Sequence, residues 1–72
     1  MNELKKVKDE VPETCRGTDS MRYSEDIVFV TEDGEAHNGF YADYAWFDRD
    51  ENSVYFTDEV KEWIYFEDIK EN

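Results

Sequence analysis

The chain has 72 residues and a formal charge of −12, from 20 Asp and Glu against 8 Lys and Arg. This length predicts one domain, the single Cys15 excludes an intramolecular disulfide, and no apolar run approaches the length of a membrane span. Fifteen acids but only three bases fall in residues 23–72, so a phosphate backbone would be repelled and direct nucleic-acid binding is disfavoured.

Residues 1–24 predict an extended arm followed by a loop. Pro12 ends any preceding helix and biases Val11 toward an extended conformation. Residues 13–24 are polar and show no hydrophobic periodicity, which is typical of a long loop. The first ten residues, MNELKKVKDE, carry charges where a secretory signal needs an apolar run. A cytoplasmic protein is therefore expected.

Residues 25–67 predict the compact part, a small antiparallel sheet. Ile27–Val30 is a short apolar run rich in β-branched residues, which favours a central strand. Asp33-Gly34 is a strong signal for a hairpin turn. The returning strand is expected at residues 36–43, where Gly39 indicates a bulge or a close backbone approach.

Three further segments are expected to be regular: residues 44–50, 53–56 and 60–68. The alternation in Trp63–Phe66 favours a strand for the last of these, although Thr57 could cap a short helix there. Residues 68–72 are expected to form a tail. The fold class is therefore mainly β: one antiparallel sheet of four to five strands, with room for one short helix.

The stretch GFYADYAWF, residues 39–47, holds five aromatic rings. Aromatic residues in strands mostly pack, so one face of each strand is expected to supply the core. Two alternatives remain open. The second face could present a partner-binding patch, with the exposed rings Tyr41, Tyr44, Trp46 and Trp63, or it could stack nucleobases, which the negative charge disfavours.

The stretch DRDENSVYFTDE, residues 48–59, has the spacing of a calcium-binding EF-hand loop. Asp48, Asp50, Asn52 and Glu59 occupy its first, third, fifth and twelfth positions. Ser53 stands where that loop needs glycine, and the preceding segment is strand-like. A solvated turn is therefore expected, with calcium binding as the minor alternative.

The sequence gives little support for a zinc site, a cysteine nucleophile or a phosphate-binding loop. Cys15 and His37 cannot build a tetrahedral zinc site without two carboxylates. The context of Cys15 matches no nucleophile motif, and the three glycines of the chain form no phosphate-binding loop. We expect no enzyme activity and no cofactor.

Four stretches follow a shared pattern. VKDEVP (residues 7–12) matches a V-x-D-x-L-P opening, and VKEW (residues 60–63) matches a V-x-x-W close. Between them, DIVFVTEDGE matches an apolar strand with a charged, glycine-containing turn, and NGFYADYAWF matches a glycine-aromatic strand leading to a tryptophan. In these features residues 7–64 resemble a family of small phage and prophage proteins, the domain of unknown function five-five-one group.

The resemblance has two departures. A leucine, Leu4, stands near the place of the family's early tryptophan, and IYFEDIKEN replaces its proline-rich tail. The family has no assigned activity, so the resemblance implies a fold and a phage origin but no chemistry. It also favours a strand at VKEW.

Phage origin and charge together suggest an inhibitor that imitates DNA. A compact domain of this length has a diameter of roughly 29 Å, and duplex DNA of that length carries about 17 phosphate charges. The target would be a basic surface on a host nuclease, CRISPR effector or restriction enzyme in the bacterial cytoplasm. The acidic residues expected to contact it are Glu25, Asp26, Glu32, Asp33, Glu35, Asp43, Asp48, Asp50, Glu51, Asp58, Glu59 and Glu62.

The alternative function is a protein-binding or self-associating adaptor. Its contact surface would have an apolar aromatic centre and an acidic rim, and a homodimer would also stabilise so short a chain. A third interpretation is that the acids only keep an aromatic-rich protein soluble.

Overall fold

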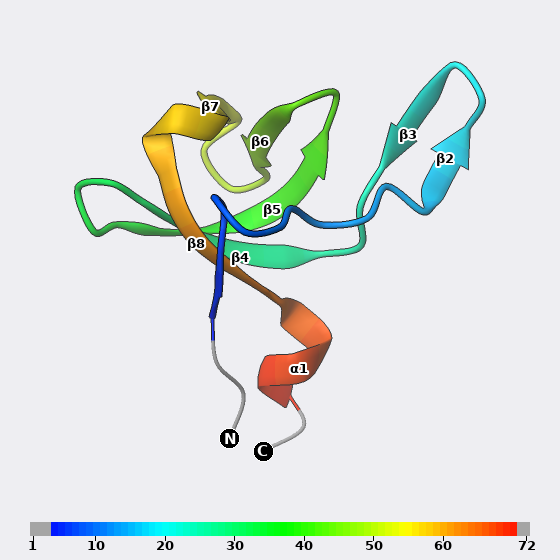
Figure 1. The fold of residues 1–72 in the computed structure, drawn as a ribbon. Helices are drawn as coiled ribbons and strands as arrows, with labels where there is room; N and C mark the ends of the chain where they lie inside the picture. Colours follow the sequence, from blue (N-terminus) through cyan, green and yellow to red (C-terminus); the bar gives the residue numbers. More distant parts are fainter. Residues whose placement is uncertain (1–3, 71–72) are drawn as a thin grey trace.

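The main sheet is antiparallel and curled (Figure 1). The structure, a computed structural model, describes residues 4–70. Four consecutive strands form a meander: β4 (Ile27–Thr31) pairs with β5 (Ala36–Ala42), β5 pairs with β6 (Ala45–Asp48), and β6 pairs with β7 (Ser53–Phe56). A 3₁₀ turn, η1 (Thr57–Glu59), then leads to β8 (Val60–Tyr65), which returns to pair with β4.

Two short elements complete this sheet. The arm contributes β1 (Lys5–Lys6), which pairs with β8 and gives the strand order β1-β8-β4-β5-β6-β7. After β8 the chain turns into helix α1 (Phe66–Lys70). The mainly β fold class is confirmed, and so is the strand at VKEW. Of the predicted arm and tail, residues 1–3 and 71–72 lie outside the described part of the chain.

A second hairpin projects from the main sheet, formed by β2 (Arg16–Thr18) and β3 (Met21–Tyr23) (Figure 1). The prediction of an irregular loop is wrong for this segment, because its strands are too short and polar to show a period. Ser24 anchors the hairpin to β5: its amide donates to the Tyr41 carbonyl at 2.8 Å, and its hydroxyl accepts from the Tyr41 amide at 2.9 Å.

The core lies on the concave face of the curled sheet. Ile27 and Phe29 of β4, Trp46 of β6 and Trp63 of β8 are fully buried. Successive strand residues point to opposite faces, so the pairing of β4 with both β5 and β8 brings these side chains together. The same cluster includes Val7, Tyr41 and Val60.

The prediction that Tyr41, Trp46 and Trp63 are exposed contact residues is wrong, because all three are buried. Each ring removes a large apolar area from water, and in so small a domain that area is needed in the core. The two indole N–H groups are also satisfied inside. Trp46 donates to the Thr57 hydroxyl at 3.3 Å, and Trp63 donates to the Glu10 carbonyl at 2.9 Å.

Both predicted glycine roles are confirmed. At Gly39 a Cβ atom would lie 1.7 Å from the Phe47 carbonyl oxygen, so β5 and β6 approach too closely for a side chain. Gly34 has φ +91° in the turn between β4 and β5, and its amide donates to the Thr31 carbonyl. Among residues 4–70 no helix has the length and apolar character needed to cross a membrane.

Candidate functional site

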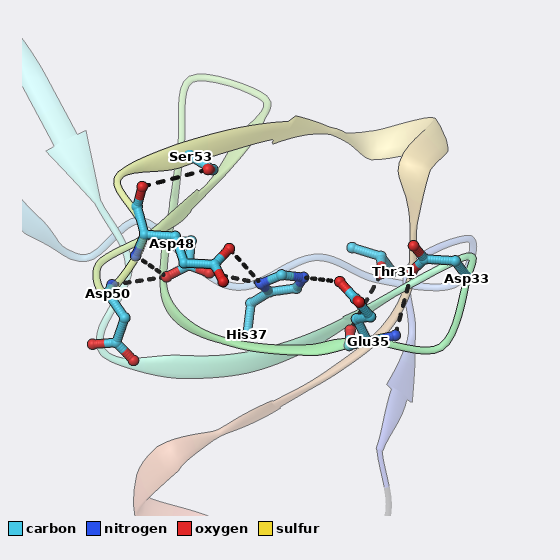
Figure 2. A network of polar contacts seen from close by, with 8 residues as sticks. Thr31, Asp33, Glu35, His37, Asp48, Asp50 and Ser53 are labelled. Carbon is cyan, nitrogen blue, oxygen red and sulfur yellow. Dashed lines mark hydrogen bonds and ion pairs between the residues drawn. The ribbon is translucent and has the colours of Figure 1, made fainter.

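Four side chains form what we call the His37 cluster: His37, Asp48, Glu51 and Glu35. Figure 2 shows His37 between Asp48 and Glu35. His37 lies on β5 with its side chain only 5% exposed. Its Nδ1 atom is 2.6 Å from Asp48 Oδ2 on β6 and 4.0 Å from Glu51 Oε1 in the following turn. Its Nε2 atom is 3.8 Å from Glu35 Oε1. Carboxylates therefore face both nitrogens of one imidazole.

Aromatic rings hold the imidazole of His37 in this orientation. The Phe29 ring stacks on it with centroids 5.3 Å apart, and the Tyr55 ring lies 4.8 Å away. These rings come from β4 and β7, so the imidazole sits inside the curl of the sheet. Burial also raises the pKa of the Tyr55 hydroxyl, and the neighbouring carboxylates raise it further.

Asp48 connects the imidazole to the turn between β6 and β7. Its Oδ1 atom accepts hydrogen bonds from the Asp50 amide at 2.7 Å (Figure 2) and from the Glu51 amide at 3.0 Å. Burial pushes the pKa of the Asp48 carboxyl up, but the hydrogen bonds from these amides and from His37 outweigh it, so the pKa lies below its ordinary value. The prediction that Asp48 belongs to the acidic surface is wrong, because its carboxylate is occupied by these hydrogen bonds.

The turn that carries Glu35 is held by its own hydrogen bonds. The Thr31 hydroxyl donates to the Asp33 carboxylate and contacts the Glu35 carbonyl. The Thr31 hydrogen bond, helped by the Glu35 amide, lowers the pKa of the Asp33 carboxyl. Within the described residues, Nε2 of His37 is the one buried side-chain nitrogen or oxygen with no hydrogen-bond partner.

The acidic residues gather at one end of the main sheet. The Glu32 amide donates to the Glu59 carbonyl at 2.8 Å, which joins the β4–β5 turn to η1, and His37 lies between Glu35 and Glu51. Three segments distant in sequence thus meet. We call their exposed acids the acidic end: Glu32, Asp33, Glu35, Asp50, Glu51, Asp58 and Glu59.

The other predicted acidic contacts lie elsewhere, and most have cationic neighbours. Asp26 pairs with Arg49 at 2.9 Å. Glu25 lies 4.0 Å from Arg16, and Glu62 lies 3.9 Å from Lys6. Asp43 is exposed in the turn between β5 and β6. The acidic surface is therefore concentrated at one end of the sheet.

The EF-hand geometry is absent from residues 48–59. This stretch is a hairpin turn followed by β7 and η1, with no helix on either side. Asp48 faces His37, and Glu59 Oε1 accepts a hydrogen bond from the Phe56 amide at 2.9 Å. The twelve-residue spacing is a coincidence in an acid-rich chain.

The exposed aromatic surface lies on the convex face of the sheet. Register aligns Phe40 of β5, Phe47 of β6 and Val54 of β7 in one row, and the two phenylalanine rings stack with centroids 5.0 Å apart. We call this row, together with Phe56 and Tyr44, the outer face. Its exposed fractions are 81% for Tyr44, 65% for Phe56 and 50% for Val54. Of the four predicted contact rings, Tyr44 alone lies here.

A groove of about 960 Å³ separates part of the outer face from the β2–β3 hairpin. Phe40 and Phe47 line it from the sheet, Met21 and Tyr23 from the hairpin, and residues 11–14 from the arm. Tyr23 packs edge-on against Phe40, and the Arg49 guanidinium lies 5.1 Å from the Phe40 ring centroid. Alternation could have shown that Phe40 and Phe47 share a face, but not which face the core takes.

Comparison of the chain with protein-family models, curated proteins and solved structures found no match. The candidates for a functional site are therefore two structural features: an aromatic outer face beside an acidic end, and a buried imidazole among carboxylates.

Proposed function

We propose that this is a small acidic binding protein that docks on a basic protein surface through its outer face. The supporting observation is the exposed pair Val54 and Phe56 beside the half-buried Phe47, flanked by the acidic end. Aromatic centres with polar rims are typical of protein interfaces. With the family resemblance, the proposal extends to a phage-type protein that inhibits a host factor in the bacterial cytoplasm.

The backbone at Tyr44 supports a contact role for this side chain. Asp43 and Tyr44 have φ values of 51° and 63°, so both stand in the left-handed region that favours glycine or asparagine. A left-handed conformation costs a residue with a side chain roughly 1–2 kcal/mol. The Tyr44 carbonyl accepts a hydrogen bond from the Thr57 hydroxyl at 3.4 Å, but the ring of Tyr44 is 81% exposed, so the side chain gains little packing energy that would offset this cost. Local strain at an exposed aromatic residue points to selection for binding.

Strand β7 offers an open edge beside these rings. It is the last strand in the sheet order, so among residues 4–70 no strand pairs with its outer edge. The Phe56 amide turns outward to Glu59, and by alternation the backbone N–H and C=O of Val54 also point outward. An extended partner segment could therefore add to the sheet here.

The acidic residues on both sides of β7 indicate which residues that partner segment should carry. Asp50 and Glu51 precede β7, and Asp58 and Glu59 follow it. If two copies paired antiparallel through β7, the acids before one strand would face the acids after the other, and like charges directly opposite are destabilising. We therefore propose a partner with Lys or Arg on both sides of an apolar centre, not a second copy of this chain.

The test is binding of wild type and matched surface variants. Capture from bacterial lysate would supply the partner, and titration of the purified partner would give the affinities. Phe56→Ser should weaken binding at least tenfold, whereas Ile69→Ser, which removes an exposed apolar side chain from α1, should leave it unchanged. Equal affinities for these two variants, or a captured partner with an acidic contact surface, would refute the proposal.

DNA imitation is the second candidate, and the concentration of carboxylates at the acidic end favours it. Under this function duplex DNA should compete with the partner, and affinity should fall steeply with salt. Glu32→Gln combined with Asp58→Asn should then cost more affinity than Phe56→Ser. The opposite ranking would support the aromatic contact.

A further inference from the structure

We propose that the His37 cluster is a binding site for a divalent transition-metal ion of the zinc type, with His37, Asp48 and Glu51 as ligands. One ligand atom from each of these residues lies within 4.8 Å of the others. Two of the three residues are buried, and Glu51 is exposed. One imidazole and two carboxylates are a donor set that Zn²⁺ accepts, with water in the remaining position.

The second nitrogen of His37 provides an independent observation. Nε2 is buried without a hydrogen-bond partner and lies 3.8 Å from Glu35 Oε1. Histidine ligands of metals almost always donate their other ring N–H to a carboxylate, a carbonyl or water. With a metal on Nδ1, the proton belongs on Nε2, where Glu35 is placed to accept it. Glu35 is thus a positioning residue.

The electrostatics of the cluster favour a cation. Glu35, Asp48 and Glu51 surround a single imidazole, and among the described residues no Lys or Arg forms an ion pair with any of them. A neutral imidazole places an unshared electron pair against a carboxylate at one nitrogen or the other. A metal ion on the Asp48 side removes this conflict and offsets the surrounding negative charge.

The site must open slightly to admit an ion. Zinc lies roughly 2.0–2.2 Å from nitrogen and oxygen ligands, so Nδ1 and Asp48 Oδ2 must separate from their present 2.6 Å. The ion takes the place of the proton that these atoms share. The exposed carboxylate of Glu51, 4.0 Å from Nδ1, can swing in to complete the ligand set. Mg²⁺ and Ca²⁺ prefer all-oxygen sites, so they should not compete.

The test uses the full chain after chelator treatment. Calorimetry with Zn²⁺ should show one bound ion per chain, Co²⁺ should give visible d–d absorption bands, and excess Mg²⁺ should not displace either. The protein has one histidine, so the ring nitrogen signals in an NMR spectrum report on His37 alone. On Zn²⁺ addition its Nδ1 signal should shift, and the ring proton displaced from Nδ1 should appear on Nε2.

Matched variants distinguish the cluster from the rest of the acidic end. Glu51→Gln removes a proposed ligand at an exposed position, and Asp50→Asn removes the same charge one residue away. Glu51→Gln removes a ligand and Glu35→Ala removes the carboxylate that positions the imidazole, so each variant should bind Zn²⁺ about 10–100-fold more weakly. The control variants Asp50→Asn and Glu32→Ala should keep the wild-type affinity. No Zn²⁺ binding by the wild type, or equal losses in ligand and control variants, would overturn the assignment.

Discussion

His37 and Asp48 meet across the neighbouring strands β5 and β6, with 2.6 Å between Nδ1 and Oδ2. The contact joins two acidic turns, because Asp48 also accepts the Asp50 and Glu51 amides while His37 faces Glu35. This one pair therefore organises both the acidic end and the proposed metal site.

Replacing Asp48 should destabilise the protein even without metal. In Asp48→Asn the side chain keeps its shape, but its charge is lost and an amide group can face His37. A buried polar group without its charged partner costs about 1–3 kcal/mol, so unfolding by urea should show a loss of that size. Asp50→Asn is the control and should change stability by less than about 0.5 kcal/mol. A loss in the control as large as in Asp48→Asn would contradict the assigned role.

The lowered pKa of Asp48 predicts a specific acid dependence. In the unfolded chain this carboxyl titrates near its ordinary value of 3.8, and in the folded chain it titrates lower. The stabilisation is then fully present above the unfolded value and is lost as the pH falls through the folded value. The difference in unfolding free energy between wild type and Asp48→Asn should therefore shrink below pH 3.8. A difference that stays constant down to pH 2, roughly two units lower, would argue against a lowered pKa.

Tyr44→Gly should separate stability from binding. Glycine adopts the left-handed conformation without the cost that Tyr44 bears at φ 63°, and Asp-Gly is a preferred pair for such a turn. The variant should be as stable as wild type or more stable by up to about 1 kcal/mol in thermal unfolding. Its affinity for the partner should nevertheless fall. Unchanged affinity would remove Tyr44 from the proposed contact surface.

Glu59 should protect the open edge of β7 against self-association. Its carboxylate accepts the outward Phe56 amide at 2.9 Å, which withdraws a donor from edge pairing. Glu59→Ala frees that donor, whereas Asp58→Ala removes an equal charge and leaves the amide bonded. Sedimentation should show more self-association for Glu59→Ala than for Asp58→Ala. Equal self-association of the two variants would mean that negative charge alone, and not the hydrogen bond to the Phe56 amide, keeps the edge unpaired.

Local patterns predicted most of the sheet correctly. The β-branched run at residues 27–30, the Asp33-Gly34 turn and the close approach at Gly39 all follow from the preferences of a few adjacent residues. The hairpin at residues 16–23 was missed because three-residue polar strands have no readable period. The turn at Asp43-Tyr44 was missed because Asp tolerates a left-handed conformation but Tyr is not typical of one, so the pair lacks the usual glycine signal.

By itself the sequence determined a small, strongly acidic β protein and the position of its long strands. Only the tertiary structure decided that Trp46 faces the core while Phe47 lies on the outer face, and that one histidine lies among carboxylates from β6 and from two turns. The physical reason is that strand period specifies alternation but not which side is buried. The pairing of β8 with β4 makes that choice by curling the sheet around one face, and no local preference encodes that pairing.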